Sequence, residues 1–259
     1  MSPTEVKSVT DFGGEGGVIV LLHGFLSSSR YWKQVQPYLT AAGYRVITID
    51  LLGFGEAPKP SQSTYNYSEH VAHIDSALAQ LNIDKPFVLI GHSMGALIAA
   101  RFAILHPAKI NSLILLHPPL YMDAAEARKT LRDTGRIYRF LLDSKYRRFG
   151  WALIKTFAFR VIGKHSRIAR EGSMRNVIEV SEILGDLEKI ETRTLVLIGM
   201  RDRPQYHINI RRARLSSFVT VITRNMSHHS PTEQPFDIQG TILDFVNQQN
   251  IIELTSTTI

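Results

Sequence analysis

The chain has 259 residues, of which 44% are hydrophobic and 20% charged, a composition typical of a globular protein large enough to bury a core. It contains no cysteine, which excludes disulfides, a thiolate nucleophile and cysteine-ligated metals. The N-terminal residues contain no apolar segment of the secretory-signal type and no apolar run reaches about eighteen residues, so we expect a cytoplasmic protein without a membrane span.

The formal net charge is +7, and the excess of positive charge lies in one segment. Residues 121–180 contain fourteen Lys or Arg against six Asp or Glu, so the rest of the chain is close to neutral. Such a basic module indicates either an anionic substrate or peripheral contact with an anionic membrane surface, with a merely solvated helical surface as the alternative. Nucleic acid is not expected as a partner, because no nucleic-acid-binding motif accompanies the charge. Nothing in the sequence predicts the oligomeric state.

Apolar runs and helical patterns alternate along the first part of the chain, which predicts an α/β fold. The runs predict a short edge strand near 6–12 and buried strands at 18–22, 44–50, 87–90 and 111–116. The helical patterns cover 31–41, 68–81 and 96–106, with Ser68 as the N-cap of the second.

The segment Gly91-His92-Ser93-Met94-Gly95 joins the strand at 87–90 to the helix that follows. A serine on a strand-to-helix turn, with a glycine two positions to either side, has the pattern of a nucleophile elbow. Side chains at the glycine positions would collide with the neighbouring strand and helix. The helix N-terminus would direct its dipole and free amides at Ser93, where an oxyanion would form. This pattern predicts a nucleophilic serine, and a glycine-rich turn without chemistry is the alternative.

Between residues 120 and 190 the strand-like runs disappear and helical periodicity with many arginines takes over. This predicts a helical cap at 120–190, inserted between two parts of an α/β core at 1–119 and 191–259. Within it, Phe149–Ile162 is apolar around most of its circumference. We expect this stretch to be buried between core and cap, with an acyl-binding or membrane-facing lid as the alternative.

After the cap the core resumes with strands at 194–199 and 218–222 and a final helix at 235–248, and residues 253–259 are expected to fray. Asp202 follows the first of these strands, and His228 and His229 follow the second. Ligands bind at the carboxyl edge of open α/β sheets, and a neutral imidazole held by a carboxylate can take the proton of a serine. We therefore predict a triad of Ser93, Asp202 and a histidine at 228 or 229.

Other titratable residues have simpler interpretations. His23 closes a strand and Asp50 precedes a glycine-rich loop, so we expect both to orient loops. His70, His73 and Asp75 share a helix, but their spacing does not form a tight metal-binding face. No metal site is predicted.

These landmarks, in this order, resemble the α/β-hydrolase superfamily. The resemblance extends over residues 18–248 and implies a mostly parallel, eight-stranded type of sheet flanked by helices, with an inserted helical cap. By the family pattern Ser93 is the nucleophile, Asp202 the acid, and the amides of Phe25 and Met94 form the oxyanion hole. A Glu five and a Pro seven positions after the histidine select His228 as the base over His229.

The resemblance implies a serine hydrolase that cleaves a carboxylic ester of a small or acyl-chain substrate through an acyl-serine intermediate, without a cofactor or metal. One alternative is a hydrolase of carbon–carbon bonds or of another anionic substrate, and a second is a monoacylglycerol-type lipase at a membrane surface. A third is a ligand-binding receptor or scaffold without activity. Ser rather than Asp at the elbow argues against the haloalkane dehalogenase and epoxide hydrolase branches.

Overall fold

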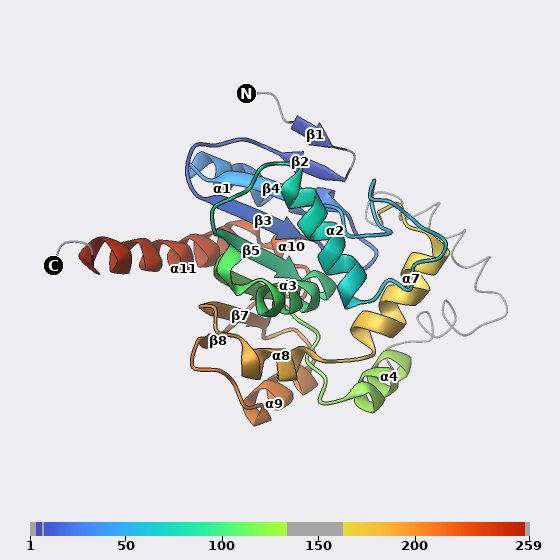
Figure 1. The fold of residues 1–259 in the computed structure, drawn as a ribbon. Helices are drawn as coiled ribbons and strands as arrows, with labels where there is room; N and C mark the ends of the chain where they lie inside the picture. The colour runs from blue at the N-terminus through green and yellow to red at the C-terminus, as the bar shows by residue number, and fades with distance from the viewer. Residues whose placement is uncertain (1–3, 7, 134–162, 257–259) are drawn as a thin grey trace.

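The computed structural model of the protein describes residues 4–6, 8–133 and 163–256. Its centre is an eight-stranded sheet in the order β1-β2-β4-β3-β5-β6-β7-β8 (Figure 1). The strands are β1 Thr4–Val6, β2 Val9–Asp11, β3 Val18–Leu22, β4 Arg45–Ile49, β5 Phe87–His92, β6 Ile110–Leu116, β7 Thr194–Gly199 and β8 Val219–Arg224. All pairs from β4 to β8 are parallel, which confirms the predicted α/β class.

The β1–β2 hairpin adds the antiparallel edge of the sheet, with β2 paired to β4. A single edge strand expected near 6–12 is therefore wrong, because the chain reverses between Val6 and Val9. In the centre, Leu22 of β3 pairs with Ile49 of β4 and with Gly91 of β5. This register brings the carboxyl ends of the central strands to one edge, where loops can meet.

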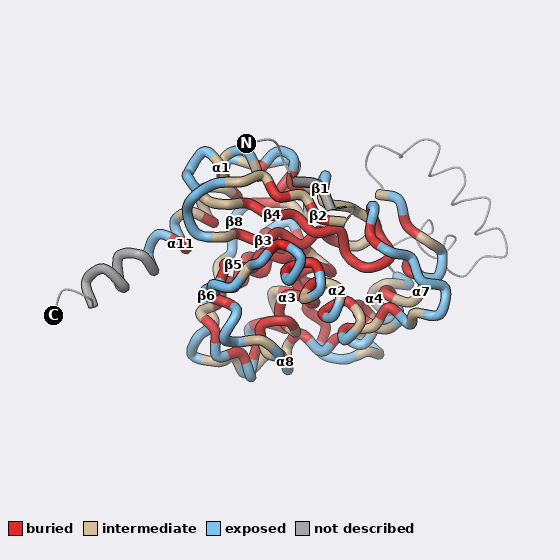
Figure 2. The backbone as a smooth tube through the Cα atoms, turned by 45° about the horizontal axis from the view of Figure 1, so that its top comes forward, coloured by how far each residue is buried: buried red, intermediate tan, exposed pale blue. Residues whose placement is uncertain are grey.

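Side chains of the central strands belong to two buried clusters, one on each face, so helices cover both faces of the sheet. Figure 2 shows these strands as buried. One face packs against α2 Tyr67–Ala79, α3 Met94–Leu105 and α8 Ile183–Lys189. The other face packs against η1 Ser29–Trp32, α1 Gln36–Ala41 and α11 Pro235–Ser256. Figure 1 shows α2 and α3 in front of the sheet and α11 running out towards the C-terminus.

The described residues between β6 and β7 form helices without a strand: α4 Ala124–Asp133, α7 Arg167–Ser173, the π-helical turn η3 Met174–Ile178, and α8. Phe149–Ile162, expected to be apolar and buried, lies outside the described residues. The segment that returns to the core passes over the loops after β3 and β4. The Gly163 amide donates to the Leu26 carbonyl at 2.9 Å, and His165 bridges to Phe54.

Three expected element boundaries are wrong, each for a local reason. Asn66, not Ser68, is the N-cap of α2, because its side chain accepts from the Glu69 amide and Glu69 accepts in return. The expected helix at 31–41 is divided into η1 and α1, since Pro37 is suited only to a first helical turn. Helix α11 continues to Ser256, past the expected fraying point, since no Gly or Pro follows Gly240 to end it.

The remaining short elements are η2 Pro107–Lys109, α9 Pro204–Arg212 and α10 Ser230–Glu233. Within the described ranges, no helix combines the length and the hydrophobicity needed to cross a membrane.

Candidate active site

Ser93 lies between the last residue of β5 and the first of α3, in a backbone conformation of φ 53° and ψ −119°. A side-chain-bearing residue rarely adopts a positive φ, so surrounding contacts must hold it there. The flanking glycines permit those contacts. A Cβ at position 91 would lie 2.3 Å from the Gly95 carbonyl oxygen, and one at position 95 would lie 2.5 Å from that of His23. The turn therefore presents Ser93 at the sheet edge in a strained conformation.

Hydrogen bonds join Ser93, His228 and Asp202. The Ser93 hydroxyl lies 3.0 Å from His228 Nε2, and His228 Nδ1 lies 2.9 Å from Asp202 Oδ1. His229 is exposed, its ring centroid lies 5.4 Å from that of His228, and no described acceptor or donor bonds to its ring. The structure brings together the three residues that the sequence singles out, with His228 rather than His229 between the other two.

Asp202 follows β7 and is almost buried, with 8% of its surface exposed. Burial alone would raise the pKa of this carboxyl, but hydrogen bonds from His117 and His228 outweigh it and hold the pKa well below its usual range. The carboxylate is therefore ionised at neutral pH and can only accept hydrogen bonds. His228 must then carry its proton on Nδ1, which leaves Nε2 free to accept the Ser93 proton.

The loop after β3 lies directly against Ser93. A Cβ added to Gly24 would lie 2.9 Å from His92 Nδ1 and 3.2 Å from the Ser93 Cβ, so a glycine suits this close approach. Within the described residues, neither the Phe25 amide nor the Met94 amide has an acceptor. Met94 is the first residue of α3, where a free amide also lies at the positive end of the helix dipole.

His23 and Asp50 orient the loops around this site. His23 donates from Nδ1 to the Gly24 carbonyl at 2.7 Å and accepts at Nε2 from the Leu51 amide at 3.0 Å. Burial lowers the pKa of His23, against the opposing charge of Asp50, so its ring is neutral. The Asp50 carboxylate accepts from the amides of Ser29 at 2.6 Å and Glu56 at 2.7 Å.

Sequence reasoning did not single out His92, His117 and Ser230, all of which are buried at the same edge. His92 Nε2 lies 2.7 Å from the His228 carbonyl, and the ring stacks on Tyr31 with centroids 4.6 Å apart. This contact fixes the backbone of the His228 loop. The available signal was positional: His92 ends β5 and His117 directly follows β6, at the edge where Ser93 and Asp202 lie.

No group of three or more His, Asp or Glu in the described part of the chain could hold a metal ion. The residues considered for a metal on α2 have separate partners: His70 lies 3.1 Å from the Ser173 hydroxyl, His73 lies 2.9 Å from the Asp50 carbonyl, and Asp75 pairs with Lys109.

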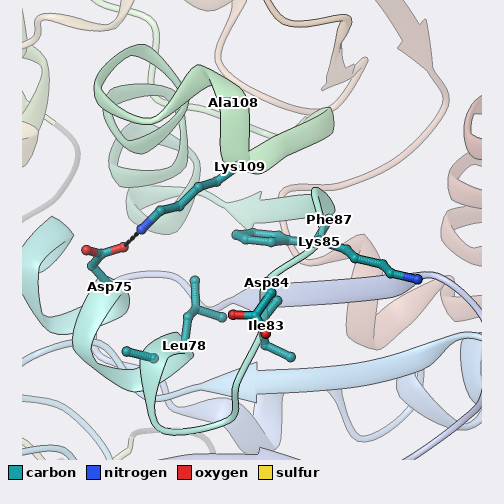
Figure 3. A pocket seen from close by; sticks show the side chains of 9 residues that line it. Asp75, Leu78, Ile83, Asp84, Lys85, Phe87, Ala108 and Lys109 are labelled. Carbon is teal, nitrogen blue, oxygen red and sulfur yellow. Dashed lines mark hydrogen bonds and ion pairs between the residues drawn. The ribbon is translucent and has the colours of Figure 1, made fainter.

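A pocket of about 320 Å³ lies far from Ser93, at the amino end of β5 (Figure 3). It is lined by Asp75, Leu78, Ala79, Ile83, Asp84, Lys85, Phe87, Ala108 and Lys109. Phe87 begins the strand whose other end carries Ser93, so this pocket cannot present a substrate to the serine.

Comparison with known proteins identifies a matching family model and several relatives. Residues 17–150, more than half of the chain, match the family model described as alpha/beta hydrolase fold. The chain is 42% identical over 108 residues to the Arabidopsis thaliana protein named "Probable lysophospholipase BODYGUARD 1", covering 40% of this chain and 23% of the relative. It is 39% identical over 104 residues to "Epoxide hydrolase 3" of Siraitia grosvenorii, covering 40% of this chain and 33% of that one. The chain thus spans a third or less of the length of these two relatives.

Among solved structures, MenH from S. aureus superposes with a TM-score of 0.74, covering 95% of this chain and all of that one. Its sequence identity of 24% means that this likeness concerns the fold alone.

Proposed function

The chain belongs to the alpha/beta hydrolase fold family, and from this premise we propose that it is a serine hydrolase of carboxylic esters. The observation that carries the proposal is the continuous hydrogen-bonded array of Ser93, His228 and Asp202, with Ser93 on a strained turn at a helix N-terminus. Such an array activates a hydroxyl that is otherwise a weak nucleophile.

In the first half-reaction, His228 Nε2 takes the proton as Ser93 Oγ attacks the ester carbon. Asp202 holds the imidazole in the required tautomer and stabilises the imidazolium that forms. The unpaired amides of Phe25 and Met94 would donate to the oxygen on which negative charge develops. His228 then returns the proton to the leaving alcohol, and the acyl group remains on Ser93.

In the second half-reaction, a water molecule replaces the alcohol. His228 takes a proton from this water as it attacks the acyl-Ser93 carbon, and returns it to Ser93 Oγ as the acid leaves. Every proton transfer uses the same imidazole, so the cycle requires no metal or cofactor.

A monoacyl ester is the substrate class to test first, because the relative from Arabidopsis thaliana carries the name of a lysophospholipase. Epoxide opening is chemically unsuited to Ser93. Attack of a serine oxygen on an epoxide would leave an ether, which water does not hydrolyse, whereas an acyl-serine ester turns over. We place substrate selection in the cap at 120–190.

The excess of Lys and Arg in residues 121–180 supports an anionic headgroup or membrane contact as a further part of this proposal. Three cations of this segment are already paired within the described residues: Lys164 with Glu56 at 2.6 Å, and Arg167 and Arg170 with Glu171 at 3.9 and 3.6 Å. To test whether the other cations of this segment attract an anionic headgroup, hydrolysis of lysophospholipids with zwitterionic and anionic headgroups is compared at low and high salt.

The first test is reaction with a fluorophosphonate probe and hydrolysis of p-nitrophenyl esters from acetate to palmitate. We expect labelling at Ser93, hydrolysis that peaks at one acyl length, and loss of both in Ser93→Ala. His228→Ala should lower kcat by about 10,000-fold or more, whereas His229→Ala, the matched control, should keep kcat within about threefold. An unlabelled Ser93 together with inactivity on every ester would refute the proposal and favour a binding protein.

A further inference from the structure

The hydrogen-bonded array does not end at Asp202. Asp202 Oδ1 faces His228, and Asp202 Oδ2 lies 2.7 Å from Nδ1 of a second histidine, His117. Nε2 of His117 lies 2.6 Å from the hydroxyl of Ser230. The array therefore runs from Ser93 through two histidines and a shared carboxylate to Ser230, with a Ser–His pair on each side of the acid. His117 and Ser230 are both fully buried, so neither reaches the substrate.

The positions of the protons in this array follow from the carboxylate. An ionised Asp202 only accepts, so both histidines must present an N–H at Nδ1. His117 Nε2 is then an acceptor, and the Ser230 hydroxyl donates to it. The Gly199 amide lies 3.1 Å from Asp202 Oδ2 and from His117 Nδ1, and with Nδ1 protonated only the carboxylate can accept. Oδ2 thus receives two hydrogen bonds, and Oδ1 receives that of His228.

The backbone is shaped to hold this second histidine. His117 directly follows β6 and has a φ of 50°, close to the 53° of Ser93 after the neighbouring strand β5. The amides of both residues continue the sheet, His117 to the Leu197 carbonyl and Ser93 to that of Leu116. A Cβ at Gly199 would lie 2.4 Å from the Met226 carbonyl oxygen and 3.0 Å from the His117 ring, so a glycine is needed beside this histidine as well. Backbone strain of this kind is retained where the surrounding structure enforces it.

We propose that His117, oriented by Ser230, is a positioning residue that acts on His228 through their shared carboxylate. This proposal rests on the proposed function of Ser93 and His228. His117 keeps Oδ1 of Asp202 directed at His228, and it withdraws part of the carboxylate charge that would otherwise stabilise the His228 imidazolium. The imidazolium is then a stronger acid and returns its proton to the leaving alcohol more readily.

Other titratable groups surround the array, and none of them bonds to Oδ2. His92 at the end of β5 contacts the His228 carbonyl, and the Tyr31 hydroxyl of η1 lies 3.2 Å from His92 Nε2. His229 and Glu233 lie on the stretch before and within α10, and Tyr206 comes from α9. Burial lowers the pKa of His92 and raises that of Tyr31, so both remain neutral at neutral pH. The charges of His92 and Tyr31 therefore do not change over the acid limb of a rate profile near neutrality.

The test compares two substitutions of His117 that share a branched shape. His117→Leu removes the N–H, whereas His117→Asn can donate to Asp202 from its amide and tolerates a positive φ. For an ester substrate we expect kcat of His117→Leu to fall about tenfold with KM unchanged, because His117 does not touch substrate. The acid limb of kcat/KM should move to higher pH by about 0.5 unit, because the carboxylate charge then acts on His228 alone. His117→Asn should restore both values.

Ser230→Ala provides an independent arm if His117→Leu does not fold. The ring of His117 then lacks its outer partner, and we expect a smaller shift of the acid limb in the same direction. A structural readout accompanies the kinetics. In Ser93→Ala, NMR should detect two downfield imidazole N–H protons, and adding His117→Leu should remove one and shift the other.

The outcomes separate the two proposals. A wild-type protein that neither hydrolyses esters nor reacts with fluorophosphonate contradicts the proposed function, and the NMR arm still tests whether two histidines share Asp202. An active wild type whose acid limb stays unchanged in His117→Leu and Ser230→Ala overturns the role of His117 alone. A fall in stability without a change in the kinetic profile likewise reduces His117 to a packing residue and overturns the proposal.

Discussion

Replacing Asp202 by asparagine tests the proton arrangement at the centre of the site. The carboxylate accepts from His228 at Oδ1 and from His117 and the Gly199 amide at Oδ2. Asparagine offers one accepting oxygen and one donating NH₂ in the same shape. The NH₂ cannot face Gly199, because a backbone amide is a fixed donor. The oxygen therefore takes the place of Oδ2, and the NH₂ faces His228.

Donation from this NH₂ group to His228 Nδ1 forces the wrong tautomer. The proton of the imidazole moves to Nε2, which can then no longer accept the proton of Ser93. We expect kcat of Asp202→Asn to fall by about 1,000- to 10,000-fold, equivalent to about 4 to 5.5 kcal/mol in the activation free energy. The folded state should be preserved, because each heavy atom of the array keeps a hydrogen-bonding partner after the tautomer change.

The assay is ester hydrolysis at neutral pH with thermal unfolding measured on the same samples. Asp186→Asn is the matched control, because Asp186 is similarly buried, at 5% exposure against 8% for Asp202, and bonds to Arg101 instead of a histidine. It should keep kcat within about twofold, whatever its effect on stability. A loss of less than about tenfold in Asp202→Asn would refute the tautomer argument.

Two further predictions concern stability. Gly95→Ala should destabilise the fold by about 3 kcal/mol or more, because its Cβ would lie 2.5 Å from the His23 carbonyl oxygen. Gly185→Ala on α8 should stabilise the fold by about 0.5–1 kcal/mol, because a Cβ there has nothing within 4 Å. Urea unfolding measures both variants, and equal effects would contradict the steric argument. Burial lowers the pKa of His70 to about 3, so between pH 6.5 and 3 the unfolded chain binds a proton that the folded chain excludes. Stability should therefore fall by up to about 1.4 kcal/mol per pH unit on acidification through this range, and His70→Gln should reduce the slope measured by urea unfolding; an unchanged slope would exclude this role.

The positions of the central strands along the chain and the nucleophile elbow could be predicted because both depend on local patterns. Buried parallel strands are apolar on both faces, so Val18–Leu22 and Phe87–Ile90 stand out as short apolar runs. The elbow requires glycines at fixed positions around a serine, and the contacts at Gly91 and Gly95 give the steric reason. The apolar strands and the elbow can each be recognised from a few consecutive residues of the sequence.

The array beyond Asp202 could not be predicted, because its partners are far apart in sequence. His117 meets Asp202 across 85 residues and Ser230 across 113. A histidine before Pro118 and Pro119 has no local pattern that distinguishes a buried partner of an acid from an ordinary loop residue. The pairing follows only from the strand order, which places β6 beside β7 and so brings the end of one strand against the loop of the next.

The difference at the N-cap of α2 has a local cause instead. Ser68 and Asn66 are both good N-cap residues, and the choice between them depends on which side chain has a reciprocal partner three residues later. Asn66 has Glu69 at that distance, whereas Ser68 has Val71. The reciprocal pairing therefore predicts Asn66 as the cap, whereas residue preference alone does not distinguish it from Ser68.

Two residues of the site, Ser93 and His117, have strained backbone conformations. Ser93 and His117 follow neighbouring strands, and each has a positive φ. Asp202 and His228 follow β7 and β8, so residues after four consecutive parallel strands converge on one carboxylate. A change in the twist of the sheet at β6 would therefore move His117 against Asp202 and alter the base without touching the substrate. Under the proposed function, the pairing of β6 with β7 sets the position of His117 relative to Asp202, so a substitution that displaces the end of β6 should lower kcat while leaving KM unchanged.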